Sequence, residues 1–338
     1  MAGFQGANGK DATVPPPRSS GIFPLSMAKQ TDPPAAPLWV VTGPTASGKT
    51  ALSVELAERT GGELLSMDSM TVYRQMDIGT AKPTAAERAR VPHHLIDLVV
   101  PQETFDTARW CELAASTVAE VLARGKRPIF VGGTPLYLMS FFKGLMTGPS
   151  ADAALRAELL AREIATPGCL HAELLGCDPA AAERIHHNDQ RRLVRALEVF
   201  TLTGKPISEQ QQHFDRVEWA RPCQLVAMQC PREELHLRVK ARTEAMLDAG
   251  LLDEVRAIER DGGFSTTSAA AIGYAECRDF LRGRYKDREE LRNMIRRHTH
   301  RLIRRQTTWL RRLRGVRWLP MGSNVADLHA AFTPQQTD

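Results

Sequence analysis

The chain has 338 residues, of which 43% are hydrophobic and 25% are charged, and its formal net charge at pH 7 is +5. This composition is ordinary for a globular protein of one large or two smaller domains. No apolar run approaches the roughly 20 residues that a helix needs to cross a bilayer, which argues against an integral membrane protein. The six cysteines include no C-x-x-C pair, so they indicate neither a zinc site nor a disulfide framework. We therefore expect reduced thiols, a cytoplasmic location and no membrane association.

Residues 1–36 contain runs of proline, scattered Gly and Ser, and little apolar periodicity. These features predict a disordered extension. The segment has no apolar signal core and is not rich in Arg, so it is not typical of a targeting peptide.

Residues 37–142 are predicted to form the first part of an α/β core. Apolar runs alternate with helical patterns, as expected of a doubly wound parallel sheet. Strands are predicted at residues 38–42, 63–67, 94–99 (the weakest of the four) and 128–131, and a helix is predicted at residues 107–123.

The strand signal disappears over residues 143–221, where helical patterns cover residues 152–164 and 189–203. This stretch is predicted to be a helical insert. Residues 222–322 return to the core, with a strand at 224–228, a helix at 231–249, a long basic helix at 287–313 and an edge strand at 316–319. Residues 323–338 are interpreted as a tail.

The basic residues are concentrated near the C-terminus. Residues 278–317 include 15 Arg and Lys and 4 Asp and Glu, whereas the remainder of the chain holds 29 basic and 35 acidic residues. A local excess of this size fits a polyanion larger than a diphosphate, such as a nucleic acid. On composition alone, a solvated helix face is an equally good interpretation.

The stretch GPTASGKT follows the first predicted strand and precedes a helical pattern, and it fits the phosphate-loop pattern G-x-x-x-x-G-K-[ST], which also occurs in ATP-binding proteins. The glycines let several backbone N–H groups face one anion, and the helix adds the positive end of its dipole. Lys49 supplies a full charge, and Thr50 supplies a hydroxyl for Mg²⁺. The predicted phosphate-binding residues are Gly43, Pro44, Thr45, Ala46, Ser47, Gly48, Lys49 and Thr50. The motif alone does not say whether the phosphate belongs to a nucleotide.

Two further candidates stand where predicted strands end, which is where ligands bind in open α/β sheets. Asp68 could hold Mg²⁺ through water, take a proton from a nucleophile, or cap the next turn. The strand at 128–131 ends in Gly-Gly-Thr, where a nucleoside-triphosphate hydrolase usually carries a carboxylate, and this weakens an ATPase interpretation. Gly132 and Gly133 would let a flat group approach the backbone. Thr134 is either a polar contact in the cleft or a cap for the following helix.

Four stretches, in this order, resemble the tRNA dimethylallyltransferase (isopentenyl-diphosphate:tRNA transferase) family: GPTASGKT, SMDSMTVYRQMDIGTAKP, VGGTPLY and HNDQRRLVRALEVF. The resemblance covers about 280 residues, from 38 to 319. It implies a phosphate-loop (P-loop) doubly wound parallel sheet with a helical insertion domain that binds the anticodon stem-loop of tRNA. It also implies transfer of a dimethylallyl group from dimethylallyl diphosphate to N6 of adenosine 37, with release of diphosphate. Mg²⁺ is the expected cofactor, and a monomer is the expected state.

The resemblance gives each candidate a role. The P-loop would hold the diphosphate without ATP, and Asp68 would be the base for an amine whose lone pair is shared with the purine ring. Thr134 would contact the reacting groups. Contacts with tRNA are implied for Asp68, Ser69, Met70, Thr71, Thr134, Arg156, Arg191, Arg192, Leu193, Val194 and Arg195.

Spacing supports part of this assignment independently of the resemblance. Arg191, Arg192 and Arg195 lie at helical spacing, so two or three of them can share one face. Ion pairing with a neighbour such as Glu198 is the alternative. The basic helix at 287–313 would lie along the RNA backbone, giving a salt-dependent affinity.

One position departs from the family pattern R-x-x-G-Y, because Ala270 stands where the Arg associated with the diphosphate is expected. Another cation, such as Arg278, could substitute. Three alternatives therefore stay open: a P-loop kinase for a small molecule or nucleoside, a prenyltransferase acting on free adenine nucleotides, and a non-catalytic RNA-binding protein.

Overall fold

The computed structural model describes residues 36–144, 149, 151–209 and 219–333. Apart from Ala36, the predicted extension at residues 1–36 lies outside these ranges. In the described ranges no helix combines the length and apolar character required to span a membrane.

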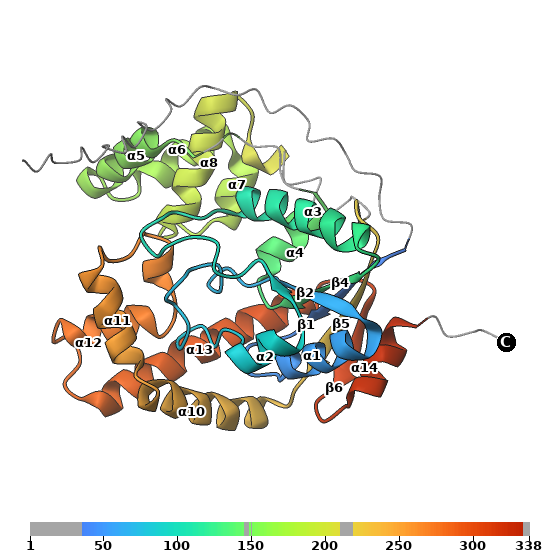
Figure 1. Cartoon of the computed structure of the whole chain (residues 1–338). Coiled ribbons are helices and arrows are strands. Elements are labelled where there is room, and N and C mark those ends of the chain that lie inside the picture. The colour runs from blue at the N-terminus through green and yellow to red at the C-terminus, as the bar shows by residue number, and fades with distance from the viewer. Residues whose placement is uncertain (1–35, 145–148, 150, 210–218, 334–338) are drawn as a thin grey trace, which may run out of the picture. The chain divides into compact units, whose positions relative to one another are not determined.

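A six-stranded sheet carries the site, and every neighbouring pair of its strands is parallel (Figure 1). The strand order is β3-β2-β4-β1-β5-β6. The strands are β1 (Leu38–Thr42), β2 (Gly62–Ser66), β3 (His93–His94), β4 (Arg127–Gly132), β5 (Cys223–Gln229) and β6 (Val316–Pro320). β1 lies between β4 and β5, so the loop that follows β1 adjoins the carboxyl ends of both neighbours. The predicted parallel sheet is confirmed.

The two faces of the sheet bury alternate residues of each strand, as the two-residue period of a strand requires. In β1, Trp39 and Val41 pack with helices α1 (Lys49–Thr60) and α14 (Val325–Phe332). Val40 faces the opposite side, which is covered by α3 (Thr107–Ala123) and α4 (Pro135–Phe142). Helices on both faces confirm the doubly wound architecture.

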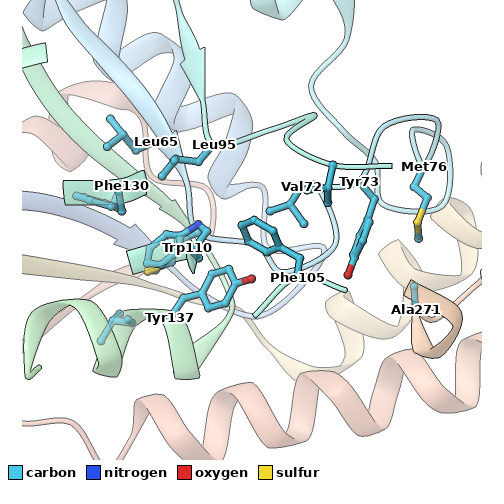
Figure 2. Packing of buried hydrophobic residues seen from close by; sticks show 14 of the residues in the cluster. Leu65, Val72, Tyr73, Met76, Leu95, Phe105, Trp110, Phe130, Tyr137 and Ala271 are labelled. Atoms are coloured by element: carbon cyan, nitrogen blue, oxygen red, sulfur yellow. The ribbon is translucent and has the colours of Figure 1, made fainter. Parts of the chain in front are cut away.

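An aromatic cluster beneath one end of the sheet supports the loop after β2 (Figure 2). Trp110 of α3 stacks on Tyr137 of α4 with ring centroids 4.3 Å apart, and it also packs edge-on against Phe130 of β4. The Trp110 indole N–H donates to the backbone oxygen of Ser66 at 3.3 Å. Because Ser66 is the last residue of β2, this bond fixes the direction in which the chain leaves the sheet.

The predicted helical insert has its own apolar core among the described residues. It contains α5 (Ala153–Ala165), α6 (Cys169–Cys177), α7 (Pro179–Arg184) and α8 (Gln190–Thr203). Buried leucines from three of these helices meet there, including Leu159, Leu170 and Leu193. The two helices expected at 152–164 and 189–203 are α5 and α8.

The second part of the core is mostly helical. It contains α10 (Arg232–Asp248), α11 (Leu251–Arg260), α12 (Tyr274–Leu281) and α13 (Arg288–Leu310), while the short α2 (Ala85–Arg90) lies earlier in the chain. α10 packs along α13, and the buried residues that join them include Leu235, Val239 and Ile303.

The strand expected at 94–99 is wrong beyond His94. Leu95 and Asp97 have φ values of 61° and 55°, which no strand tolerates. The backbone turns so that the Asp97 carboxylate can pair with Lys82 at 2.7 Å and with Arg88 at 2.7 Å.

The segment interpreted as a tail from residue 323 begins with a packed helix. Asn324 caps α14, with Asp327 completing a capping box. Leu328 and Phe332 are buried, and the Phe332 ring stacks on Trp39 at 4.6 Å. The core therefore extends to Phe332, and only residues 334–338 lie outside the description here.

Candidate active site

The start of helix α1 leaves its amides open to an anion, whereas two earlier P-loop amides are occupied. The Thr45 N–H donates to the Gln306 Oε1 at 2.9 Å, and the Ser47 N–H donates to the Pro44 oxygen at 3.3 Å. Ala46 and Gly48 adopt left-handed backbone with φ of 65° and 85°. Helix α1 begins at Lys49, and no side chain of the described residues caps it. Because the first N–H groups of a helix have no intrahelical acceptor, they point out of the helix toward any anion placed there. The Ser47 hydroxyl is buried and has no hydrogen-bond partner among the described residues.

Lys49 is a cation placed where burial makes its charge costly. Its ammonium donates to the backbone oxygen of Pro44 at 3.2 Å. The pKa of Lys49 is lowered to about 8, mainly by burial; the charge of Asp68 opposes the shift and that of Arg242 adds to it. A bound anion would raise this pKa again, because an opposite charge favours protonation of the amine.

Helix α10 adds two guanidinium groups that the sequence reasoning missed. Burial lowers the pKa of Arg242 while Asp68 opposes the shift, so Arg242 faces the same carboxylate as Lys49. One turn earlier, Arg238 lies so close that a Cβ on Gly48 would be 3.4 Å from its Nη1. The available signal was the R-x-x-x-R spacing on a helix that follows a strand next to β1, because this spacing puts both side chains on one face.

Asp68 and Thr134 meet where β2 and β4 end. The Asp68 Oδ1 accepts from the Met70 N–H at 2.9 Å, and its second oxygen has no hydrogen-bond partner among the described residues. The Thr134 hydroxyl accepts from the Ser69 N–H at 3.1 Å, and the Thr134 N–H donates to the Met67 oxygen at 3.2 Å. Thr134 occupies the first position before α4, but its hydroxyl makes no capping bond. The structure therefore brings Asp68 and Thr134 together and shows that the Thr134 hydroxyl does not cap α4. Their catalytic roles stay predictions.

The interpretation of Gly132 and Gly133 needs correction, because protein atoms fill the space that we expected a flat ligand group to use. A Cβ on Gly132 would lie 2.2 Å from the Met67 oxygen. A Cβ on Gly133 would lie 2.6 Å from the Gln306 Nε2 and 3.0 Å from the Gly43 oxygen. These glycines let the P-loop, the end of β2 and helix α13 pack directly against the end of β4.

The three residues after Asp68 differ in how far they are buried. Ser69 and Met70 are half-buried, whereas Thr71 is buried and its hydroxyl pairs with that of Ser66 at 2.8 Å. The Thr71 side chain therefore points into the protein interior. The predicted tRNA contacts stay predictions, with Ser69 and Met70 the more accessible candidates.

The run MDIGTAKP that follows is anchored by one carboxylate. Glu254 of α11 accepts from the N–H groups of Asp77 at 3.1 Å and Ile78 at 2.9 Å, and it also pairs with the Tyr274 hydroxyl. The same hydroxyl accepts from the Gly79 N–H at 3.1 Å. The run is therefore anchored through its backbone, and Gly79 leaves room for the Tyr274 ring, which a Cβ at that position would approach to 2.3 Å.

In the insert, the arginines predicted to contact tRNA are in part ion-paired. The Glu198 side chain is fully buried, and its oxygens accept from Arg156 at 2.7 and 2.8 Å and from Arg195 at 2.5 Å. The alternative of ion pairing is thus realised for Arg195 with Glu198, and Arg156 shares that partner. Arg192 also lies 3.4 Å from Asp189, and both Arg191 and Arg192 are exposed.

The side chains of Leu193 and Val194 are not accessible to tRNA. Both are buried in the apolar core of the insert. Any contact that they make with RNA would therefore use their backbone.

A groove of about 710 Å³ runs between α10 and α13. Its lining contains six arginines and two histidines and no acidic residue, the basic members being Arg232, His236, Arg296, Arg297, His300, Arg301, Arg304 and Arg311. Such a groove is a suitable site for a polyanion.

Arg278, which we considered as a replacement for the missing family Arg, pairs with other residues. Arg278 pairs with Glu259 at 2.6 Å and lies over the Phe264 ring at 4.9 Å. Ala270 itself is exposed. Arg242 is therefore better placed than Arg278 to supply charge beside Lys49.

The fold and site together define a P-loop protein in which the open amides at the start of α1 and the half-buried Lys49 lie at the same sheet edge as Asp68. The family model for IPP transferase matches residues 71–313. A tRNA dimethylallyltransferase from Anaeromyxobacter dehalogenans (strain 2CP-1) is 48% identical over 86% of this chain and 95% of its own length. One from Roseiflexus sp. (strain RS-1) is 44% identical over 89% of this chain and 98% of its own. The chain belongs to the IPP transferase family.

Solved structures agree. The full-length tRNA isopentenylpyrophosphate transferase from Bacillus halodurans has a TM-score of 0.64 and 38% identity, covering 87% of this chain and 94% of its own. A eukaryotic dimethylallyltransferase, described as acting on tRNA, has a TM-score of 0.69 and 26% identity, covering 85% and 74%.

Proposed function

We propose that the protein transfers a dimethylallyl group from dimethylallyl diphosphate to N6 of adenosine 37 in tRNA and releases diphosphate. The observation that carries this proposal is that the P-loop after β1 and the Asp68 and Thr134 pair after β2 and β4 lie at the same edge of the parallel sheet. The Thr134 hydroxyl accepts from the Ser69 N–H at 3.1 Å, and a Cβ on the preceding Gly133 would lie 3.0 Å from the Gly43 oxygen of the P-loop. A loop suited to a diphosphate and a carboxylate suited to an amine proton are therefore neighbours, and the effect of Asp68 on the pKa of Lys49 and Arg242 agrees with this arrangement. Membership of the IPP transferase family supports the same chemistry.

The reaction needs charge stabilisation at one end and proton removal at the other. The C–O bond to the diphosphate breaks with its electron pair on the leaving oxygen, where the P-loop amides, Lys49 and Arg242 stabilise the growing charge. The N6 lone pair forms the new C–N bond, and its proton passes to Asp68. Thr134, which is fixed by Ser69, lies next to Asp68 and orients the reacting groups.

The residues present fit a magnesium ion that retains water and substrate oxygens among its ligands. No group of three or more His, Cys, Asp or Glu suited to a metal is found in the described ranges. Thr50 stands in the first turn of α1, half-buried beside Lys49, where its hydroxyl would hold Mg²⁺ together with the diphosphate. The ion would add positive charge to the leaving group.

We further propose that tRNA binds through the basic groove between α10 and α13 and through the exposed Arg191 and Arg192 of the insert. The groove would hold backbone phosphates. The target adenine has to leave its stack to reach Asp68, because N6 is not accessible to a closed cleft while the base is stacked. The insert is accordingly assigned as a tRNA-binding domain.

The test is mass analysis of nucleosides after incubation of unmodified tRNA with the protein, dimethylallyl diphosphate and Mg²⁺. A mass increase of one dimethylallyl group on adenosine 37 is expected. Transfer to AMP in preference to tRNA would favour the adenine-nucleotide enzyme, and ATP-dependent phosphoryl transfer without an isoprenoid would favour a kinase. Intact RNA binding without product would support the non-catalytic alternative.

A further inference from the structure

The side chain of Gln306 is a buried polar group in the most basic helix of the chain. Gln306 is 7% exposed, although Arg304 and Arg305 precede it in α13. Both ends of its amide are used. Its Oε1 accepts from the Thr45 N–H at 2.9 Å, and its Nε2 donates to the Gly133 oxygen at 2.8 Å.

These two bonds connect three parts of the site that are far apart in sequence. Thr45 lies in the P-loop, and Gly133 directly precedes Thr134. Gln306 lies on α13, the helix that lines the basic groove with Arg304 and Thr307 on either side of it in sequence. The Gln306 side chain therefore connects α13, which lines the proposed RNA-binding groove, with the P-loop and with the end of β4 next to Asp68.

The local packing requires an amide at this position. The Thr45 N–H needs an acceptor and the Gly133 oxygen needs a donor, and a glutamine side chain supplies one of each. A leucine would supply neither, which would leave the buried Gly133 oxygen and the half-buried Thr45 N–H without these partners. Gly133 is matched to this arrangement, because a Cβ there would lie 2.6 Å from the Gln306 Nε2.

We propose that Gln306 is a positioning residue that holds the P-loop and the Gly133–Thr134 segment in register with α13. Through this bridge, occupation of the α13 surface by tRNA affects the affinity of the P-loop for diphosphate. The inference rests on the proposed function for the identity of both ligands. It goes beyond that function in assigning a residue that touches neither ligand.

The experiment compares the wild-type protein with Gln306→Leu, which removes both bonds of the bridge, and with Gly133→Ala, which displaces the Gln306 amide and also crowds the Gly43 oxygen of the P-loop. Ser268→Ala is the matched control, because the Ser268 side chain is also buried and donates to the backbone oxygen of Pro101 at 2.6 Å. Calorimetry measures the Kd of inorganic diphosphate with and without unmodified tRNA. Steady-state kinetics measure kcat and both KM values well below the melting temperature of each variant.

We expect Gln306→Leu to weaken diphosphate binding and raise the KM for dimethylallyl diphosphate by about 10-fold, with a larger fall in kcat/KM, because misplaced reacting groups cost rate. The affinity for tRNA should stay within about two-fold, since the basic side chains of α13 remain. The effect of tRNA on the diphosphate Kd should shrink toward none. In the double variant, the effects of Gln306→Leu and Gly133→Ala should be less than additive, because they share the contact between Gln306 and Gly133.

Two outcomes would overturn the proposal. One is a Gln306→Leu protein that loses thermal stability as Ser268→Ala does but keeps wild-type kinetics, which would make Gln306 merely structural. The other is a wild-type diphosphate Kd that tRNA does not change. Failure of the proposed function is distinguishable, because a protein that transfers no dimethylallyl group still reports whether diphosphate binding depends on Gln306.

Discussion

Replacement of Asp68 by Asn tests the proposed base with little disturbance of the surrounding turn. The Asp68 Oδ1 accepts from the Met70 N–H at 2.9 Å, and the Asn amide oxygen can accept the same bond. The cost to stability should therefore stay below about 1 kcal/mol, the usual net value of one hydrogen bond. What the variant loses is the ability to take up a proton.

The expected loss of rate follows from the role of the carboxylate. A positioned general base contributes about 100- to 10,000-fold, so single-turnover transfer should slow by that range. Diphosphate binding should not weaken, because the variant removes a negative charge beside Lys49 and Arg242. Asp68 raises the pKa of Lys49, so its loss moves that pKa below about 8. Binding is therefore compared below neutral pH, where Lys49 is protonated in both proteins.

The assay measures three quantities on one preparation: the single-turnover rate with tRNA, the Kd of inorganic diphosphate, and the Kd of unmodified tRNA. The reasoning is refuted if Asp68→Asn transfers the dimethylallyl group within about ten-fold of wild type, because that loss is smaller than removal of a general base explains. Loss of both ligands together would instead make Asp68 structural.

Three further predictions concern the cationic residues. Lys49→Met should weaken diphosphate far more than tRNA in calorimetry. Without ligand, Lys49→Met should raise the melting temperature at pH 7, because the wild-type protein there carries the full cost of burying the Lys49 ammonium. The difference in melting temperature should shrink as the pH rises from about 8 toward 10.5, because Lys49 loses its proton at lower pH in the folded state than in the unfolded state. Arg242→Met should raise the KM for dimethylallyl diphosphate by about 10-fold or more while tRNA affinity is kept, and an unchanged KM would remove Arg242 from the site. Arg304→Gln should reduce the slope of log affinity for tRNA against log salt by about one, and an unchanged slope would place the RNA elsewhere.

Much of the fold could be predicted because its signals are local. Apolar runs and helix stops placed β1, α3, α8 and α13 within a few residues of their bounds. The chain after His94 could not be placed correctly, because Asp97 pairs with Lys82 and Arg88 and these tertiary bonds override strand propensity. Helix α14 was missed although Asn324 and Asp327 form a capping box that a short segment can reveal.

Some residues of the site could likewise be predicted from local motifs, and others could not. Lys49 and Asp68 follow strands within recognisable motifs, so their meeting at one sheet edge could be predicted. Arg242 and Gln306 lie on helices far along the chain, and their approach depends on how α10 and α13 pack. No spacing rule connects residue 306 with residues 45 and 133, since the contact exists only in the folded chain. The two glycines before Thr134 were misread for the same reason.

The carboxylate of Glu254 has a consequence for how relatives are recognised. It holds the backbone of Asp77 and Ile78, and nothing in that contact involves a reacting atom. Loss of Asp68 would leave this anchoring in place, so the loop would fold as before. A database search keyed to this run therefore retrieves shared ancestry and architecture, and the acid nine residues before Asp77 has to be checked separately before catalysis is assigned.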